Sequence, residues 1–80
     1  MMQKKLSERE IICLQWAAEG KTSWETATIL GLSERTVNFH LQNACGKLHV
    51  HSRRAAVAQA LRQGLLGTLN GSASMSARIR

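Results

Sequence analysis

With 80 residues the chain is expected to form one small domain, and a domain of this size leaves little room for a large catalytic cleft. Its net charge is +6, but residues 6–66 hold seven Lys and Arg against five Glu, so charge alone argues only weakly for a nucleic-acid partner. The two cysteines form no CxxC pair, which excludes a disulfide scaffold, and the absence of an apolar run of membrane-spanning length excludes a membrane protein. Both observations indicate a soluble cytosolic protein.

The first predicted element is a helix over residues 8–19. Ser7 and Glu10 stand three residues apart, which is the spacing of a capping box, and Gly20 can end the helix. Side chains three and four residues apart form its inward side: Glu10, Cys13, Leu14 and Ala17. Because proline is absent and strong helix formers dominate the composition, the whole fold is expected to be all-α.

The next two helix starts flank a glycine. Thr22 and Glu25 have capping-box spacing, so a helix is expected over 23–30. Ser33 caps the following helix, and Gly31 between them can take the left-handed conformation that ends the first one. Two short helices joined by so tight a turn predict a helix-turn-helix, a motif that places its second helix in the major groove of DNA.

The helix after Ser33, expected over 34–48, has two different sides. At about 100° per residue, one side holds the residues expected in the core: Val37, His40, Leu41, Ala44, Cys45 and Leu48. The other side holds Arg35, Phe39, Gln42 and Gly46, flanked by Asn38 and Asn43. Polar side chains with one aromatic residue suit base edges better than a core, and the alternative is an ordinary polar surface.

A fourth helix begins after Ser52 and is expected from residue 53 to 64 or 66. Its inward side holds Val57, Ala60, Leu61 and Gly64, and its other side holds Ala55, Gln59, Arg62 and Leu66. A helix that is apolar on two sides is either fully packed in the core or in contact with the same helix of a second subunit, and both alternatives stay open. Residues 67–80 are small and polar without periodicity, so we expect a domain over 6–66 followed by a disordered, flexible tail.

Six motifs follow one another between residues 6 and 50: Leu6-Ser-Glu-Arg-Glu10, Trp16-Ala-Ala-Glu-Gly-Lys-Thr22, Glu25-Thr-Ala27, Ile29-Leu-Gly-Leu-Ser-Glu-Arg-Thr-Val-Asn-Phe-His40, Asn43-Ala and Lys47-Leu-His-Val50. In order and spacing they resemble the DNA-binding domain of the LuxR/GerE family of bacterial transcription factors, and most of all its quorum-sensing branch. Full-length members of that branch carry an N-terminal domain for acyl-homoserine lactones. The resemblance implies a four-helix bundle containing a helix-turn-helix, and the output domain of a transcriptional regulator that works at the nucleoid in the bacterial cytoplasm.

The resemblance also implies which residues contact DNA. Base edges are met by Asn38, Phe39 and Gln42, where both amides match adenine, and Arg35 can reach either guanine or a phosphate. Phosphates are met by Thr36 and Lys47, with further backbone contacts expected at Lys21, Ser23 and Asn43. The last helix forms the dimer contact, in agreement with its second apolar side: Ala55, Gln59, Arg62 and Leu66. The expected partners are therefore double-stranded DNA with a two-fold symmetric site and a second copy of the chain, and no cofactor is expected.

Two residues depart from the family pattern. Thr26 stands where the family usually has Ile, so its hydroxyl needs a hydrogen-bond partner in the core to avoid a desolvation cost of about 1 to 3 kcal/mol. Gly46 lies inside the recognition helix, the helix expected over 34–48, and lowers its stability by about 1 kcal/mol relative to Ala. Both departures predict modest stability and neither contradicts the fold.

Three other classes of function have less support in the sequence. An enzyme is not expected, because the chain shows no Ser/His/Asp set, no paired carboxylates and no phosphate-binding glycine loop. Cys45, His49 and His51 suggest a metal site, but four well-spaced ligands are lacking, so none is expected. The strongest alternative is a helical protein-interaction module that contacts RNA polymerase or another regulator through Ile11, Ile12, Trp24 and the fourth helix.

Overall fold

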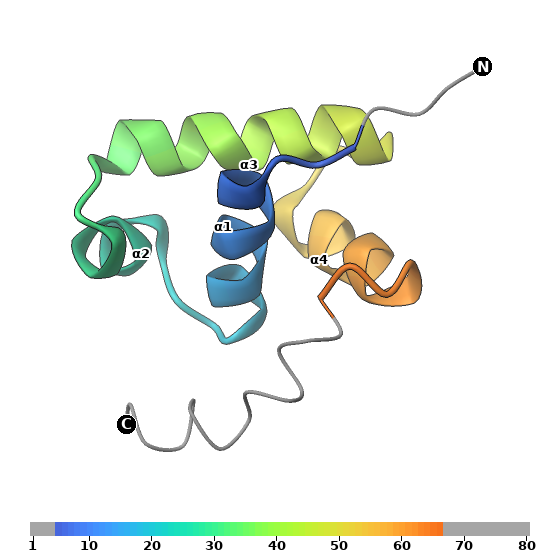
Figure 1. The fold of residues 1–80 in the computed structure, drawn as a ribbon, viewed down its shortest axis with the longest axis horizontal. Coiled ribbons are helices and arrows are strands. Elements are labelled where there is room, and N and C mark those ends of the chain that lie inside the picture. The colour runs from blue at the N-terminus through green and yellow to red at the C-terminus, as the bar shows by residue number, and fades with distance from the viewer. Residues whose placement is uncertain (1–4, 67–80) are drawn as a thin grey trace.

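The computed structural model describes residues 5–66, which form a bundle of four helices (Figure 1). The helices are α1 (Glu8–Ala18), α2 (Ser23–Leu30), α3 (Glu34–Leu48) and α4 (Arg53–Arg62). The long helix α3 contacts each of the other three, and α1 crosses beneath it between α2 and α4. Within residues 5–66 there is no strand, so the prediction of an all-α fold is confirmed. The tail expected over 67–80 lies outside the described residues.

All four helices begin at the predicted cap residues: Ser7, Thr22, Ser33 and Ser52. In α1 the bonding is reciprocal, because the Ser7 hydroxyl accepts from the Glu10 N–H at 3.2 Å and the Glu10 carboxylate accepts from the Ser7 N–H at 2.8 Å. Thr22 and Glu25 repeat this arrangement at 3.0 and 2.8 Å. Each cap satisfies backbone donors that a first helical turn leaves without partners, so local sequence decides where the helices start.

Left-handed residues end the two helices of the helix-turn-helix. Gly31 follows α2 with φ of +71°, as predicted, and the chain enters α3 three residues later. His49 ends α3 with φ of +61°, a conformation that costs a residue with a Cβ more than it costs glycine. The His49 N–H offsets part of this cost by bonding the carbonyls of Cys45 and Gly46.

The core lies where α1 and α3 cross and is closed by α4. Its buried apolar residues are Cys13, Leu14, Ala27, Val37, Leu41, Ala44, Leu48, Ala56, Ala60 and Leu66. The inward sides predicted for the first and third helices are largely confirmed, although Ala17, His40 and Cys45 are only half-buried. Thr26 is almost fully buried, and no buried polar side-chain atom of residues 5–66 lacks a hydrogen-bond partner. The hydroxyl at this position therefore does not carry the full desolvation cost.

The packing predicted for the fourth helix is wrong at Leu61, Leu66 and Gly64, of which Gly64 was placed on the inner side and is exposed. Leu66, placed on the outer side, is completely buried, whereas Leu61, placed on the inner side, is 50% exposed. Leu66 is buried because α4 ends at Arg62 and Gly64, with φ of +76°, turns the chain back toward the core. Leu61 is exposed because Ala56 and Ala60 form the buried side of α4. A residue beyond that turn no longer follows helical periodicity, so Leu66 is a core residue and cannot form a dimer contact in this structure.

Candidate nucleic-acid interface

The side of α3 opposite the core is open to solvent. Asn38, Phe39 and Gln42 are all exposed, and the Phe39 ring is 57% exposed. Arg35 is exposed on the first turn of the same helix. The other side of α3 is buried along its whole length by Val37, Leu41, Ala44 and Leu48. The residues predicted to read bases are thus brought to one surface, held from behind by the core.

The predicted phosphate-contacting residues are dispersed around this surface. Thr36, Asn43 and Lys21 are half-buried. The Ser33 hydroxyl accepts from the Thr36 N–H at 3.1 Å and donates to the Thr36 hydroxyl at 2.9 Å, which leaves the Thr36 hydroxyl its own proton to donate. The structure is compatible with phosphate contacts at these three positions, which stay predictions.

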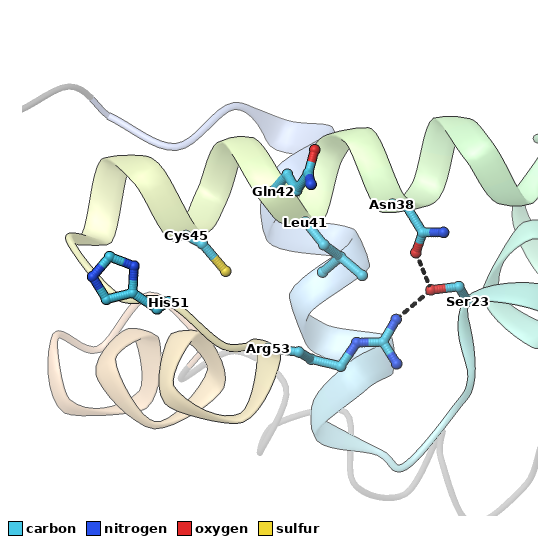
Figure 2. Close-up of a pocket in the computed structure, with 7 residues that line it drawn as sticks. All are labelled: Ser23, Asn38, Leu41, Gln42, Cys45, His51 and Arg53. Atoms are coloured by element: carbon cyan, nitrogen blue, oxygen red, sulfur yellow. Dashed lines mark hydrogen bonds between the residues drawn. The ribbon is translucent and has the colours of Figure 1, made fainter.

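A groove of about 570 Å³ lies beside the exposed side of α3 (Figure 2). It is lined by Ser23, Asn38, Leu41, Gln42, Cys45, His51 and Arg53. Inside it, the Ser23 hydroxyl donates to the Asn38 side-chain oxygen at 2.5 Å and accepts from the Arg53 guanidinium. Three helices are joined in this way, because Ser23 begins α2, Asn38 lies on α3 and Arg53 begins α4.

Ser23 therefore has a different role from the one expected. Its side chain is only 8% exposed and its hydroxyl already serves two partners, so a direct side-chain contact with phosphate does not fit the structure. Arg53 was missed by sequence reasoning, although one signal points to it. A cation in the first turn of a helix opposes the helix dipole, and α4 begins with two arginines and no acidic residue.

Lys47 is held in an ion pair. Its ammonium donates to the Glu10 carboxylate at 2.9 Å and to the Lys5 carbonyl at 3.2 Å. The two side chains are 24% and 5% exposed, respectively, so the pair is largely removed from solvent. The phosphate contact expected at Lys47 stays a prediction, because only two of the three ammonium protons are used in tying the C-terminal part of α3 to the start of α1.

This pairing controls the ionisation of Glu10. Burial raises the pKa of the Glu10 carboxyl, but hydrogen bonds from Lys47 and from the Ser7 N–H, together with the charge of Lys47, lower the pKa more. The net pKa lies below its ordinary value, and the carboxylate is charged at neutral pH. A charged pair beneath α3 then stabilises the bundle only while both partners are present.

The residues considered for a metal site are not arranged as ligands. Over the described range, 5–66, no group of three His, Cys, Asp or Glu side chains is placed to hold an ion. Burial raises the pKa of the Cys45 thiol, which the charge of Arg53 only partly opposes, and its sulfur lies 3.6 Å from the Ser52 carbonyl.

Comparison with known families decides what this surface belongs to. Residues 4–60 match the family described as "Bacterial regulatory proteins, luxR family". The chain belongs to the LuxR family. It is a helix-turn-helix DNA-binding domain of a transcriptional regulator, as the motifs in the sequence indicate.

The relatives of this LuxR-family chain are regulators. The quorum sensing-dependent transcriptional regulator RpaR of Rhodopseudomonas palustris is 55% identical over 62 residues, which are 78% of this chain and 26% of RpaR. The transcriptional activator VanR of Vibrio anguillarum is 52% identical over 61 residues, 76% of this chain and 25% of VanR. LuxR of Aliivibrio fischeri is 49% identical over the same length, 76% of this chain and 24% of LuxR. The chain thus spans about a quarter of the length of these curated relatives.

The fold is confirmed by a solved structure. The structure of the transcription factor GerE superposes with a TM-score of 0.71 at 31% identity, covering 76% of this chain and 92% of GerE. Because the relatives are transcriptional regulators, the expectation that this LuxR-family domain is not an enzyme is also confirmed. None of the helices in residues 5–66 is long and apolar enough to span a membrane.

Proposed function

We propose that this domain binds double-stranded DNA at specific sequences, with α3 in the major groove, as the output domain of a bacterial quorum-sensing regulator. The observation that carries the proposal is the exposed side of α3, where Asn38, Phe39 and Gln42 stand away from the core. A ring of that exposure stabilises the isolated domain little, whereas it can cover a thymine methyl group at a base edge. Gln42 offers one donor and one acceptor, the pattern of adenine in the major groove.

Phosphate contacts would fix the position of α3 on the duplex. We assign them to Lys21, Thr36 and Asn43, with Arg35 reaching either a phosphate or guanine. Such contacts give affinity without sequence choice, whereas the residues on the exposed side of α3 discriminate among bases. The bacterial cytoplasm, at the nucleoid, is where such a domain would act.

We further propose that two copies bind together through α4. The outer residues named from the sequence remain candidates in part, since Ala55 and Gln59 are half-buried and Arg62 is exposed. Arg62 donates to the Gln59 side-chain oxygen at 2.8 Å, and Leu61 supplies the apolar surface that Leu66 cannot. Two domains related by two-fold symmetry would place two α3 helices in half-sites about one helical turn apart.

The test is selection of bound duplexes from a random pool by the 80-residue chain, at low and at high salt. The proposal predicts enrichment of one motif with two-fold symmetry, and an affinity that falls as salt rises. Gln42→Ala serves as the matched variant, because it removes a base contact without changing charge. A pool that stays random for the parent chain would overturn the proposal.

A second candidate function is supported by the outer face of α2. Trp24 is 63% exposed there and Ile29 is also exposed, so this helix carries more uncovered apolar surface than its fold requires. Such a surface fits a protein partner, for which RNA polymerase or another regulator is the candidate. Ile11 and Ile12 are half-buried and Ile11 packs against the core, so they contribute less than expected. Binding to a protein partner without any DNA affinity would favour this function over the first.

A further inference from the structure

The orientation of the Asn38 side chain is set from outside the recognition helix. Asn38 is exposed, yet its side-chain oxygen is turned back toward the start of α2, where it accepts from the Ser23 hydroxyl at 2.5 Å. Ser23 is buried and accepts in turn from the half-buried Arg53. Figure 2 shows the three side chains converging at one end of the groove, with the amide nitrogen of Asn38 pointing away from Ser23.

The hydrogen-bonded chain from Arg53 through Ser23 to Asn38 is called the relay. The chemistry of its three groups fixes which group donates and which accepts. A guanidinium has donors only, so its bond to Ser23 occupies an acceptor position of the hydroxyl oxygen. The single hydroxyl proton is directed to Asn38, whose oxygen is the atom that faces Ser23, and an amide NH₂ group could not accept it. The end of the amide left for a ligand is the NH₂ group, with two donors.

We propose that Arg53 is a positioning residue for DNA recognition, which acts through Ser23 to present Asn38 to the base edge as a hydrogen-bond donor only. This inference rests on the proposed function of α3. It changes what Asn38 would read, because adenine offers one acceptor and one donor in the major groove, whereas guanine offers two acceptors. A donor-only Asn38 therefore favours guanine over adenine at the base pair that it faces, and Gln42 alone keeps the adenine pattern.

Removing the relay frees the amide to turn. Without Ser23 the Asn38 oxygen loses its partner, and without Arg53 the Ser23 hydroxyl is free to accept from the amide instead of donating to it. In both variants rotation about the last side-chain bond can offer either end of the amide to the base. The preference for guanine should then fall by about three- to tenfold, the range expected for one net hydrogen bond. In Ser23→Ala, affinity for DNA of unrelated sequence should stay the same, since neither a charge nor a phosphate contact is lost, and in Arg53→Met it should change no more than in Arg54→Met.

The competing explanation is that Arg53 contacts a phosphate directly. In that case Arg53→Met would weaken all duplexes equally and reduce the salt dependence by about one contact, and Ser23→Ala would have no effect on base preference. The two explanations thus differ in the effect that they predict for Ser23→Ala, a substitution at a buried residue without charge.

The experiment uses the 80-residue chain and its variants Ser23→Ala, Arg53→Met, Asn38→Ala and Ser23→Ala with Asn38→Ala. The base pair that faces Asn38 is identified first, as the position of the selected site at which Asn38→Ala loses discrimination. Competition among four duplexes that differ only there gives the guanine-to-adenine preference, and binding at several salt concentrations gives the salt slope. Arg54→Met is the control for charge, because Arg54 is exposed, follows directly in α4 and is not part of the relay.

We expect Ser23→Ala and Arg53→Met to lose the same three- to tenfold preference at this one base pair, Arg54→Met to retain it, and the double variant to match Asn38→Ala. Thermal unfolding by circular dichroism checks that each variant is folded. If Arg53→Met does not fold, Ser23→Ala decides the question alone, since alanine is readily accommodated at the start of a helix. Full guanine preference in folded Ser23→Ala would overturn this inference, whereas a parent chain without any preferred site would overturn the proposed function.

Discussion

The ion pair between Glu10 and Lys47 allows a quantitative test of what holds α3 in place. The substitution Lys47→Met removes the ammonium and keeps an unbranched side chain. Breaking a buried pair by removing one partner costs about 3–5 kcal/mol of unfolding free energy. Lys47 is 24% exposed, and Glu10 retains the bond from the Ser7 N–H, so we expect a loss of about 2–3 kcal/mol near neutral pH. In a domain this small, that loss would lower the melting temperature by roughly 10–20 °C.

The pH dependence separates this effect from a simple loss of packing. In the parent, the pKa of Glu10 lies below its ordinary value of 4.5, so the pair stabilises the fold above that pH and the stabilisation is lost as pH falls through the lowered pKa. In Lys47→Met, burial is opposed only by Ser7, so the Glu10 pKa rises and protonation relieves the cost of the buried charge. The stabilities of the two proteins should therefore converge as the solution is acidified below pH 4.5.

The assay is urea unfolding followed by circular dichroism for the parent, Lys47→Met, Glu10→Gln and the double variant, near neutral pH and at about pH 4. The double-mutant cycle isolates the coupling between the two side chains. A stability difference of the same size at both pH values would refute the ion-pair explanation. An unchanged stability with a smaller salt dependence of DNA binding would instead restore the phosphate role expected from the sequence.

Four further substitutions test the recognition surface, the end of α4 and the turn. Gln42→Ala should lower affinity for the selected site while leaving unrelated duplexes unaffected in a mobility-shift assay, and equal losses on both would remove Gln42 from the base contacts. Leu66→Ala should lower the free energy of unfolding in urea by about 2–4 kcal/mol, because Leu66 is fully buried. Leu61→Ser should change that free energy by no more than about 0.5 kcal/mol, because Leu61 is half exposed, and should weaken self-association measured by sedimentation. The opposite pattern would show that the outer side of α4 is assigned wrongly. Gly31→Ala should lower the free energy of unfolding by about 1–2 kcal/mol in thermal unfolding. The cost comes entirely from the φ of +71°, since an added Cβ would meet no atom within 4 Å. An unchanged melting temperature would contradict that origin.

The sequence was sufficient wherever a structural feature depends on neighbours within one or two helical turns. The four cap residues, the bounds of α2 and α3, and the turn at Gly31 all follow from short-range hydrogen bonds and allowed backbone angles. The exposure of Asn38, Phe39 and Gln42 follows from helical periodicity, because a helix packed on one side leaves the other side open. These features, with the order of the motifs, determined the fold class and the family.

Tertiary structure alone decided which partners the polar side chains take. Lys47 and Glu10 are separated by 37 positions, and Arg53 and Ser23 by 30, so no local pattern relates them. The burial of Leu66 also depended on where α4 stops, which a turn after its last residue determines. Long side chains such as Lys and Arg reach whichever acceptor the packing brings near, and burial then makes that contact strong. For this reason the sequence determined which residues of α3 face outward, whereas the fold determined which of them are already hydrogen-bonded and which remain open to a ligand.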